Sequence, residues 1–165
     1  MADKELLTRL LASTAGWNRW RAKDAKRRPD LRGADLKHAN LRGADLRRAN
    51  LSESDLSQAN LSEARLGSAD LTRAVLIEAD LIGADLSRAI LNGAALIGTY
   101  LIGADLRRST LNVTDLRGAD LRDADLRGAD LRSSFFLIQA QLETATGDLE
   151  TKLPPSLIRP QHWRP

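Results

Sequence analysis

The sequence predicts an all-β solenoid, a β-helix in which the chain turns a corner every five residues and buries a column of leucines. Every fifth residue from Leu31 to Leu131 is Leu, which makes 21 consecutive positions without an exception. A small residue recurs at the same period: of the 21 positions from Ala34 to Ser134, 16 are Ala and the others are Ser or Thr. A fixed period over most of a chain is typical of repeat architectures.

The five-residue period fits neither a helix nor a straight strand. Leucines at this spacing would step around all sides of an α-helix and would alternate between the two faces of a strand. The chain must therefore turn once per repeat, with coils stacked about 4.8 Å apart through backbone hydrogen bonds. Glycines suit corners where φ is positive, and other repeats carry Arg, Glu or Ser there, so the corners need not all be one type. The corner glycines are Gly33, Gly43, Gly83, Gly93, Gly98, Gly103, Gly118 and Gly128.

The residue before Leu is Asp or Asn at 15 of the 21 positions from Asp30 to Asp130. Segments such as 44–48, Ala-Asp-Leu-Arg-Arg, and 119–123, Ala-Asp-Leu-Arg-Asp, follow the pattern A-(D/N)-L-X-X. Over about 100 of its 165 residues the chain resembles the pentapeptide-repeat family. This resemblance implies a right-handed quadrilateral β-helix with four repeats per coil, hence about five coils. The pairs Ile77 with Ile97 and Ile82 with Ile102, each 20 residues apart, agree with that period.

The chain divides into a capping helix at 1–28, a repeat region at 29–146 and a Pro-rich C-terminal cap or tail at 147–165. In the first segment Leu6, Leu7, Leu10 and Leu11 are spaced like one side of a helix, with Trp17 and Trp20 beyond them. We expect a capping α-helix with a break near Gly16, ended by Pro29. The alternative is a basic arm for nucleic acid or a membrane surface. That arm would use Arg19, Arg21, Lys23, Lys26, Arg27 and Arg28.

The repeat slips after Phe136, where one extra residue enters near 135–137. Ala140 and Leu142 then resemble the repeat one residue late. Four prolines keep the tail from continuing the ladder, and we expect its apolar side chains to cover the end of the coil. Those side chains are Leu149, Leu153, Leu157, Ile158 and Trp163. The alternative is a flexible segment that binds a partner.

The sequence gives no indication of catalysis. It has no Cys, and its two imidazoles, His38 and His162, lie in a repeat corner and in the tail. The many Asp residues recur as part of the repeat, and nine of the 21 residues that follow Leu are Arg or Lys. No phosphate-binding Gly loop, nucleophile motif or zinc spacing is present, and a rod packed with Leu leaves no cavity for a small-molecule substrate. We therefore expect no enzyme activity, no catalytic residue, no metal and no cofactor.

The charge pattern bears on nucleic acid and on one alternative function. Seven arginines fall along one side of the coil, which suggests an anion track, but four aspartates share that side, so a solvated ion-pair ladder is the better interpretation. Some relatives resemble duplex DNA and bind DNA gyrase as dimers, so a DNA-mimic binder of gyrase or topoisomerase is the alternative. Here the formal net charge is +3 and Arg cancels much of the Asp field. The residues are Arg47, Arg48, Arg65, Arg88, Arg107, Arg108 and Arg127 with Asp45, Asp85, Asp105 and Asp125.

One stretch departs from the repeat pattern by placing apolar residues at outward positions. We interpret it as a surface for self-association or for an unidentified protein partner, because contiguous exposed apolar patches are commonly functional. The other interpretation is a set of β-branched ladders that stiffen the coil. The residues of this candidate surface are Val75, Ile77, Ile82, Ala95, Ile97, Tyr100 and Ile102.

These observations together predict a non-enzymatic scaffold or protein-interaction module. Residues 1–5 lack the basic start of a secretory signal and no stretch is long and apolar enough to span a membrane. The absence of Cys fits a reducing compartment. We therefore expect a cytoplasmic, bacterial protein that binds no membrane, and the sequence does not name its partner.

Overall fold

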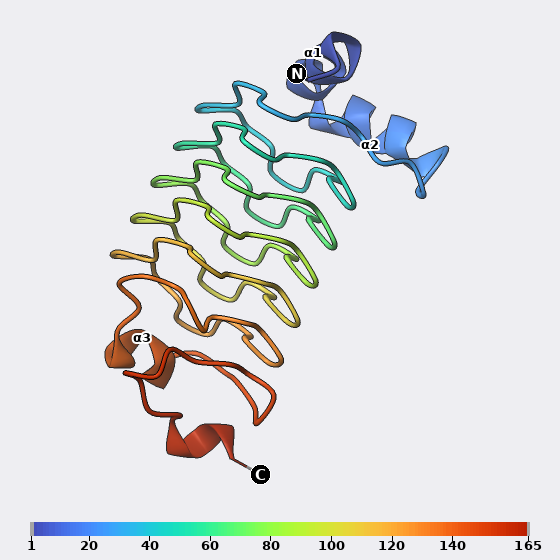
Figure 1. Ribbon diagram of the computed structural model, residues 1–165. Coiled ribbons are helices and arrows are strands. Elements are labelled where there is room, and N and C mark those ends of the chain that lie inside the picture. The colour runs from blue at the N-terminus through green and yellow to red at the C-terminus, as the bar shows by residue number, and fades with distance from the viewer. Residues whose placement is uncertain (1, 165) are drawn as a thin grey trace.

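The computed structural model describes residues 2–164 as a single stack of coils with helices at both ends (Figure 1). Parallel bridges pair each residue before a Leu, from Asp30 to Asp115, with the residue twenty positions later, as in Asp30 with Asn50 and Asp45 with Arg65. The predicted right-handed quadrilateral β-helix is confirmed, with four repeats per coil. We name its faces by their first leucine: face A begins at Leu31, face B at Leu36, face C at Leu41 and face D at Leu46.

The interior is a column of leucines. Each of the 21 repeat leucines is at most 1% exposed, and the small residues beside them are also buried, apart from Ser134 and Ala39, which are half-buried. Where Ser or Thr replaces Ala, its hydroxyl donates to a backbone carbonyl: Ser54 Oγ to Leu51 O at 2.6 Å, and Thr99 Oγ1 to Leu76 O at 2.7 Å. The substitutions therefore leave these buried hydroxyls paired, as buried polar groups require.

All twenty corners from residue 33 to residue 128 share one backbone conformation. The third residue of each turn has φ between +56° and +72°, whether or not it is Gly, and the turn is closed by a bond such as Ala34 N to Leu31 O at 3.1 Å. The corners that carry Arg, Glu or Ser therefore have the same positive φ as those that carry Gly. A positive φ at this position is typical of type II turns, and the stacking geometry requires it even where a side chain opposes it.

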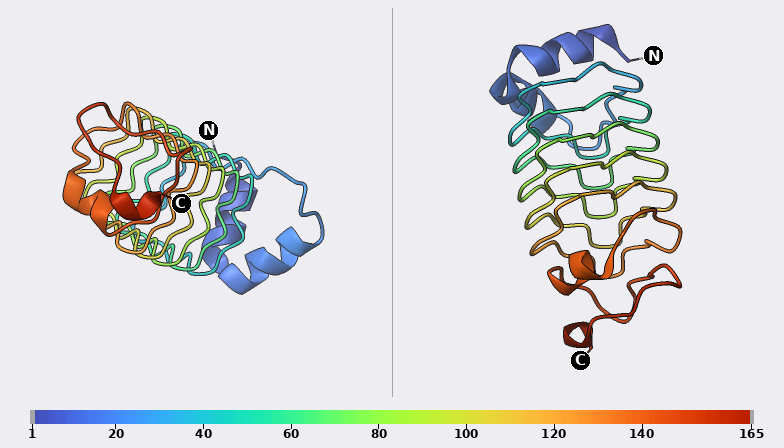
Figure 2. Two further views of the ribbon diagram at one scale, coloured as in Figure 1. Left: turned by 90° about the horizontal axis from the view of Figure 1, so that it is seen from below. Right: turned by 90° about the vertical axis from the view of Figure 1, so that its left-hand side faces the viewer.

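Two helices, not one, form the N-terminal cap: α1 (Lys4–Ala12) and α2 (Thr14–Ala22). The break lies at Ser13 and not near Gly16. Ser13 is extended, and its Oγ accepts the N–H of Gly16 at 3.1 Å, so it begins α2 as an N-cap. Figure 2 shows the pair beside the first coil. Met1 and Pro165, at the outer ends of the two predicted caps, are outside the described residues.

Helix α2 satisfies the open hydrogen-bonding edge of the first coil. Trp17 Nε1 donates to Asp45 O at 2.9 Å, and Asn18 Oδ1 accepts the N–H of Asp45 at 2.7 Å. Arg21 is fully buried, and its guanidinium donates to four carbonyls, those of Asp45, Asp24, Arg27 and Arg47. Of the six residues of the predicted basic arm, Arg21 is therefore a buried part of the cap, and the other five are exposed.

The register shifts at the C-terminal end as the sequence predicts. Asp125 pairs with Thr146 and Asp130 with Lys152, so the spacing lengthens by one residue and then by a second. The first extra residue enters after Phe135, which still pairs at a spacing of twenty, and before Thr146; Phe136, with φ +58°, begins this segment. Leu142 is buried as expected, but Ala140 is exposed because residues Gln139–Glu143 form helix α3 instead of a repeat.

A tryptophan closes the last coil. Gly147 occupies the place that Leu126 holds one coil earlier, and a Cβ there would collide with the indole of Trp163. Trp163 is the last residue of the short 3-10 helix η1 (Gln161–Trp163). Its side chain is buried, and its Nε1–H donates to Ala145 O at 2.8 Å. Leu153 and Leu157 pack against the core. The prediction that Leu149 and Ile158 also cover the end is wrong, since both are largely exposed.

Replacement of Val113 by Gly is expected to stabilise the fold. Val113 has φ +61°, a conformation that costs an L-residue about 1–2 kcal/mol, whereas Gly adds about 0.5–1 kcal/mol of unfolded-state entropy. The free energy of unfolding in urea should rise by roughly 0.5–1 kcal/mol. The same change at Val75, whose φ is not positive, is the control and should destabilise. A lower free energy of unfolding in both variants would contradict the claim that the positive φ strains Val113.

Replacement of Arg21 by Met is expected to destabilise the N-terminal cap. The variant leaves buried carbonyls of Asp45 and Arg47 with fewer donors, which costs about 1–3 kcal/mol. Arg19→Met removes the same charge from an exposed position on the same helix and is the matched control. Urea denaturation followed by tryptophan fluorescence measures both. Equal effects of the two substitutions would show that Arg21 contributes only its charge.

Candidate interaction surface

The apolar residues singled out in the sequence come together on two adjacent faces. Val75 bridges to Ala95 on face B, where Ile77 and Ile97 follow the leucines. Face C contributes Ile82, Tyr100 and Ile102 from the same two coils. We call these seven residues the BC surface. Ile82 is 42% exposed and Tyr100 49%, and the other five are half-buried, so the centre of the surface is a stacked ladder and its outer side chains reach solvent.

Three further apolar side chains lie at the C-terminal end of face B, and the sequence analysis did not assign them to a surface. Phe135 pairs with Asp115, which itself pairs with Ala95, so it continues the row of the BC surface after one polar residue. Phe135, Phe136 and Ile138 are exposed, Phe136 by 59%. Phe136 and Ile138 line a shallow cleft of about 640 Å³ beside α3. The sequence feature that could have indicated this second apolar site is the pair of adjacent Phe residues, since the chain has no other Phe.

The cleft and the BC surface are separated by an ion pair. Arg117 Nη2 lies 2.7 Å from Asp115 Oδ2, and the Arg117 guanidinium also stacks 4.4 Å over the Phe136 ring. Ile90 is exposed as well but lies on face A. The Arg117–Asp115 ion pair therefore limits the BC surface toward the C-terminal end of the stack. Ile90 is an exposed isoleucine outside this surface.

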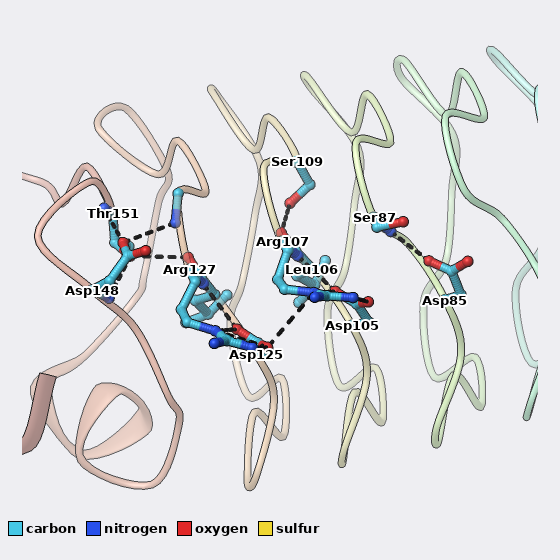
Figure 3. A network of polar contacts seen from close by, with 12 residues as sticks. Asp85, Ser87, Asp105, Leu106, Arg107, Ser109, Asp125, Arg127, Asp148 and Thr151 are labelled. Atoms are coloured by element: carbon cyan, nitrogen blue, oxygen red, sulfur yellow. Dashed lines mark hydrogen bonds and ion pairs between the residues drawn. The ribbon is translucent and has the colours of Figure 1, made fainter.

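Face D carries the predicted ion-pair ladder (Figure 3). Arg107 and Arg127 each turn back to the aspartate two residues before them, with Nη2 to Oδ2 distances of 2.6 Å. Arg107 Nε also lies 3.7 Å from Asp125 Oδ2, which links two coils. At the first coil, Arg47 pairs with Asp45 at 2.7 Å. These ion pairs hold Arg47, Arg65, Arg107 and Arg127, whereas Arg48, Arg88 and Arg108 form no ion pair within 4.0 Å among residues 2–164.

The ladder lowers the pKa of its aspartates. At Asp105 the hydrogen bonds from Arg107 outweigh partial burial and lower the carboxyl pKa. At Asp45 burial is the largest influence and opposes ionisation, but the hydrogen bonds of Arg47 and the charge of Arg65 together outweigh it, so the pKa is again lowered. The pKa of Arg107 is correspondingly raised. These groups are held in their charged forms, unlike an acid–base catalyst, whose pKa lies near the working pH.

A polar hollow of about 710 Å³ runs along face D. It opens because Gly67 and Ser87 stand where other coils carry Arg, and Asp85 faces it with its Oδ1 accepting the N–H of Ser87 at 2.9 Å. Arginines and carboxylates both line this hollow. It is a break in the ladder with mixed charge.

Among residues 2–164 no cluster of three or more His, Asp or Glu could hold a metal ion. His38 is exposed on the first coil, and His162 Nε2 lies 3.0 Å from Ala145 O at the other end. The two imidazoles are thus not brought together. None of the described helices has the length and apolar character of a membrane span.

Comparison with known proteins agrees with this architecture. The family model described as Pentapeptide repeats matches residues 30–67, 54–93, 69–108 and 94–133. HetL, a pentapeptide repeat protein involved in heterocyst differentiation regulation from the cyanobacterium Nostoc sp. strain PCC 7120, is 27% identical, with a TM-score of 0.54 over 81% of this chain and 72% of its own. No curated protein matches the sequence.

Two further solved structures are similar at lower TM-scores. The pentapeptide repeat protein Rfr23 from the cyanobacterium Cyanothece 51142 is 27% identical, covering 87% of this chain and 97% of its own, with a TM-score of 0.37. The plasmid-mediated fluoroquinolone resistance protein QnrB1 is 20% identical, covering 82% of this chain and 79% of its own, with a TM-score of 0.39. The likeness to QnrB1 concerns the fold alone.

Acid is expected to destabilise the protein through its paired aspartates. Because their folded pKa lies below the unfolded value of about 3.9, the unfolded chain binds protons more readily, so this stabilisation is complete above that value and is lost as pH falls through the folded pKa. Urea denaturation at about pH 6 and about pH 3 should show the loss. The lowered groups are Asp45, Asp55, Asp105, Asp115, Asp120, Asp130 and Asp148.

The double variant Arg107→Gln with Arg122→Gln is the control for this titration. It removes the cations that hydrogen-bond Asp105 and Asp120, so its stability should change less between the two pH values. A variant with the full acid dependence of the wild type would show that these pairs do not cause it.

Proposed function

The chain belongs to the pentapeptide-repeat family, and on this premise we propose that it is a non-enzymatic protein-interaction module of the cytoplasm. The BC surface is its binding surface. The observation that carries the proposal is the loss of the polar pattern at consecutive outward positions of two stacked coils, which leaves Ile82 and Tyr100 over 40% exposed. Exposed apolar patches of this kind commonly mark interaction sites.

The stack of isoleucines also has a structural explanation. β-branched side chains on neighbouring coils contact one another and stabilise the ladder. That explanation accounts for the half-buried Ile77 and Ile97 better than for Tyr100, whose ring replaces an Asp or Asn and reaches solvent. A role in partner binding accounts for both, and it agrees with the regulatory role stated for HetL.

The gyrase-binding alternative gains little from the charge distribution. A DNA mimic needs long acidic rows on its surface, whereas every row of residues before the leucines is interrupted, as by Arg65 on face D and Tyr100 on face C. Where Asp is present, Arg often neutralises it, as in the Asp120–Arg122 pair at 2.6 Å. The resemblance to QnrB1 carries no functional weight. We therefore place partner binding through the BC surface first.

Replacement of Ile77, Ile82, Ile97 and Ile102 by Ser tests the proposal. Immobilised wild-type and variant proteins are used to capture partners from a native extract, and capture is quantified. Loss of four buried isoleucines from an interface should lower capture by more than about tenfold. The mass of each protein in solution, measured by light scattering, shows whether the partner is a second copy of the chain.

Ile90→Ser is the matched control, since it changes an exposed isoleucine on face A. Circular dichroism and thermal denaturation must show that both variants fold. Undiminished capture by the quadruple variant, together with monomers for every protein, would refute the BC surface as the binding site.

A further inference from the structure

Residues 75–82 and 95–102, the two segments that carry the BC surface, contain only two charged residues, and both are acidic. Glu78 occupies the corner between Ile77 and face C, and Asp80 pairs along face C with Asn60 and Tyr100. Glu78 accepts a hydrogen bond from Gln58 Nε2 at 2.7 Å, and Asp80 accepts the N–H of Ile82 at 2.9 Å. Neither carboxylate has a cationic partner within 4.0 Å among residues 2–164. Both are therefore available to a ligand.

Four other carboxylates on the same two faces are neutralised by this chain, whereas Asp35 on face B forms no ion pair among residues 2–164. Asp55 pairs with Lys37 at 3.1 Å, and Glu63 with Arg42 at 2.7 Å. Asp115 and Asp120 pair with the arginines two residues later. In the repeat that contains Asp80 the equivalent residue is Ile82. The substitution that makes this position apolar therefore also removes the counterion of Asp80.

This combination sets the chemistry of a partner. A carboxylate that becomes enclosed in an apolar interface without a cation costs several kcal/mol, so a partner that covers Ile82 and Tyr100 must supply positive charge beside Asp80 and Glu78. Nucleic acids and anionic membranes carry the wrong sign. Each of the two coils that carry the surface is about 4.8 Å thick along the stack, so together they measure about 10 Å. One helix with its side chains has about the same width.

We infer that the BC surface binds a cationic amphipathic helix of a partner protein. Its apolar side chains pack on the isoleucines and Tyr100, and a Lys or Arg on each side of that stripe pairs with Glu78 and Asp80. This inference rests on the proposed function, and it adds the charge and the secondary structure of the partner. Packing of the apolar face of an amphipathic helix on an apolar surface is a recurring mode of peptide recognition.

The test measures binding of three labelled synthetic peptides of about 14 residues by fluorescence anisotropy, with the full-length protein. One is an amphipathic helix of Leu and Lys, the second replaces Lys by Glu, and the third is a scrambled Leu/Lys sequence. The protein variants are Glu78→Gln with Asp80→Asn, and the quadruple Ile-to-Ser variant. Asp70→Asn with Glu150→Gln, away from the BC surface, is the control that changes net charge equally.

The Leu/Lys helix should bind the wild type, and the Glu78/Asp80 variant should bind it about tenfold more weakly. The difference should shrink between about 50 and about 300 mM salt, because salt screens exposed pairs. The Asp70/Glu150 control should keep wild-type affinity. The scrambled peptide, with the same charge but no apolar stripe, should bind at least about tenfold more weakly than the helix.

Several results would overturn the inference. If the Ile-to-Ser variant bound the Leu/Lys helix as tightly as the wild type does, the peptide would be attracted by charge alone. Equal binding of the Leu/Glu helix by the wild type, with dependence on the isoleucines, would refute the cationic partner while leaving the proposed interaction site intact. Failure of the Leu/Lys helix to bind would also refute it. The capture experiment above judges the proposed function independently, because it uses no peptide of chosen charge.

Discussion

The structure depends on a hydrogen-bond ladder in which each coil of the repeat region contains twenty residues. Leu31 N donates to Asn50 O at 2.8 Å, and Asn50 N donates to Pro29 O at 2.8 Å, so each coil both receives bonds from the previous one and gives bonds to the next. Any added residue would move every later side chain to another position on the square. The first extra residue enters only between Phe135 and Thr146, where few repeats remain to be displaced.

The ladder also explains why the two unrelated ends use the same chemistry. A terminal coil presents unpaired carbonyls around an apolar cross-section, so its cover must be both large and a hydrogen-bond donor. Tryptophan has this combination. Trp17 and Trp163 each insert a ring and donate Nε1 to a coil carbonyl, and each is accompanied by an arginine that donates to a backbone carbonyl, Arg21 to Arg47 O and Arg159 to Thr151 O at 2.7 Å.

The repeat region could be predicted from sequence because its determinants are local and periodic. The ends could not, because they depend on contacts between distant residues. Gly16 suggested a helix break, yet the Ser13 hydroxyl fixes the break by capping α2. Nothing near Gly147 shows that a tryptophan sixteen residues later takes the place of its missing leucine. The register slip near 135–137 is visible in the sequence, but the exposure of Phe135 and Phe136 depends on how α3 closes the coil.

The same local logic explains why the BC surface stands out. In most repeats that carry Asp before Leu and Arg after it, the two side chains neutralise each other within three residues, as Arg127 does with Asp125 at 2.6 Å. A coil built from such repeats presents a polar and nearly neutral exterior by default. A single change from Arg to Ile then has two effects, because it exposes an apolar side chain and frees a carboxylate. Ile82 and Asp80 show both effects, so apolar contact and negative charge occur together on this surface as a consequence of the repeat itself.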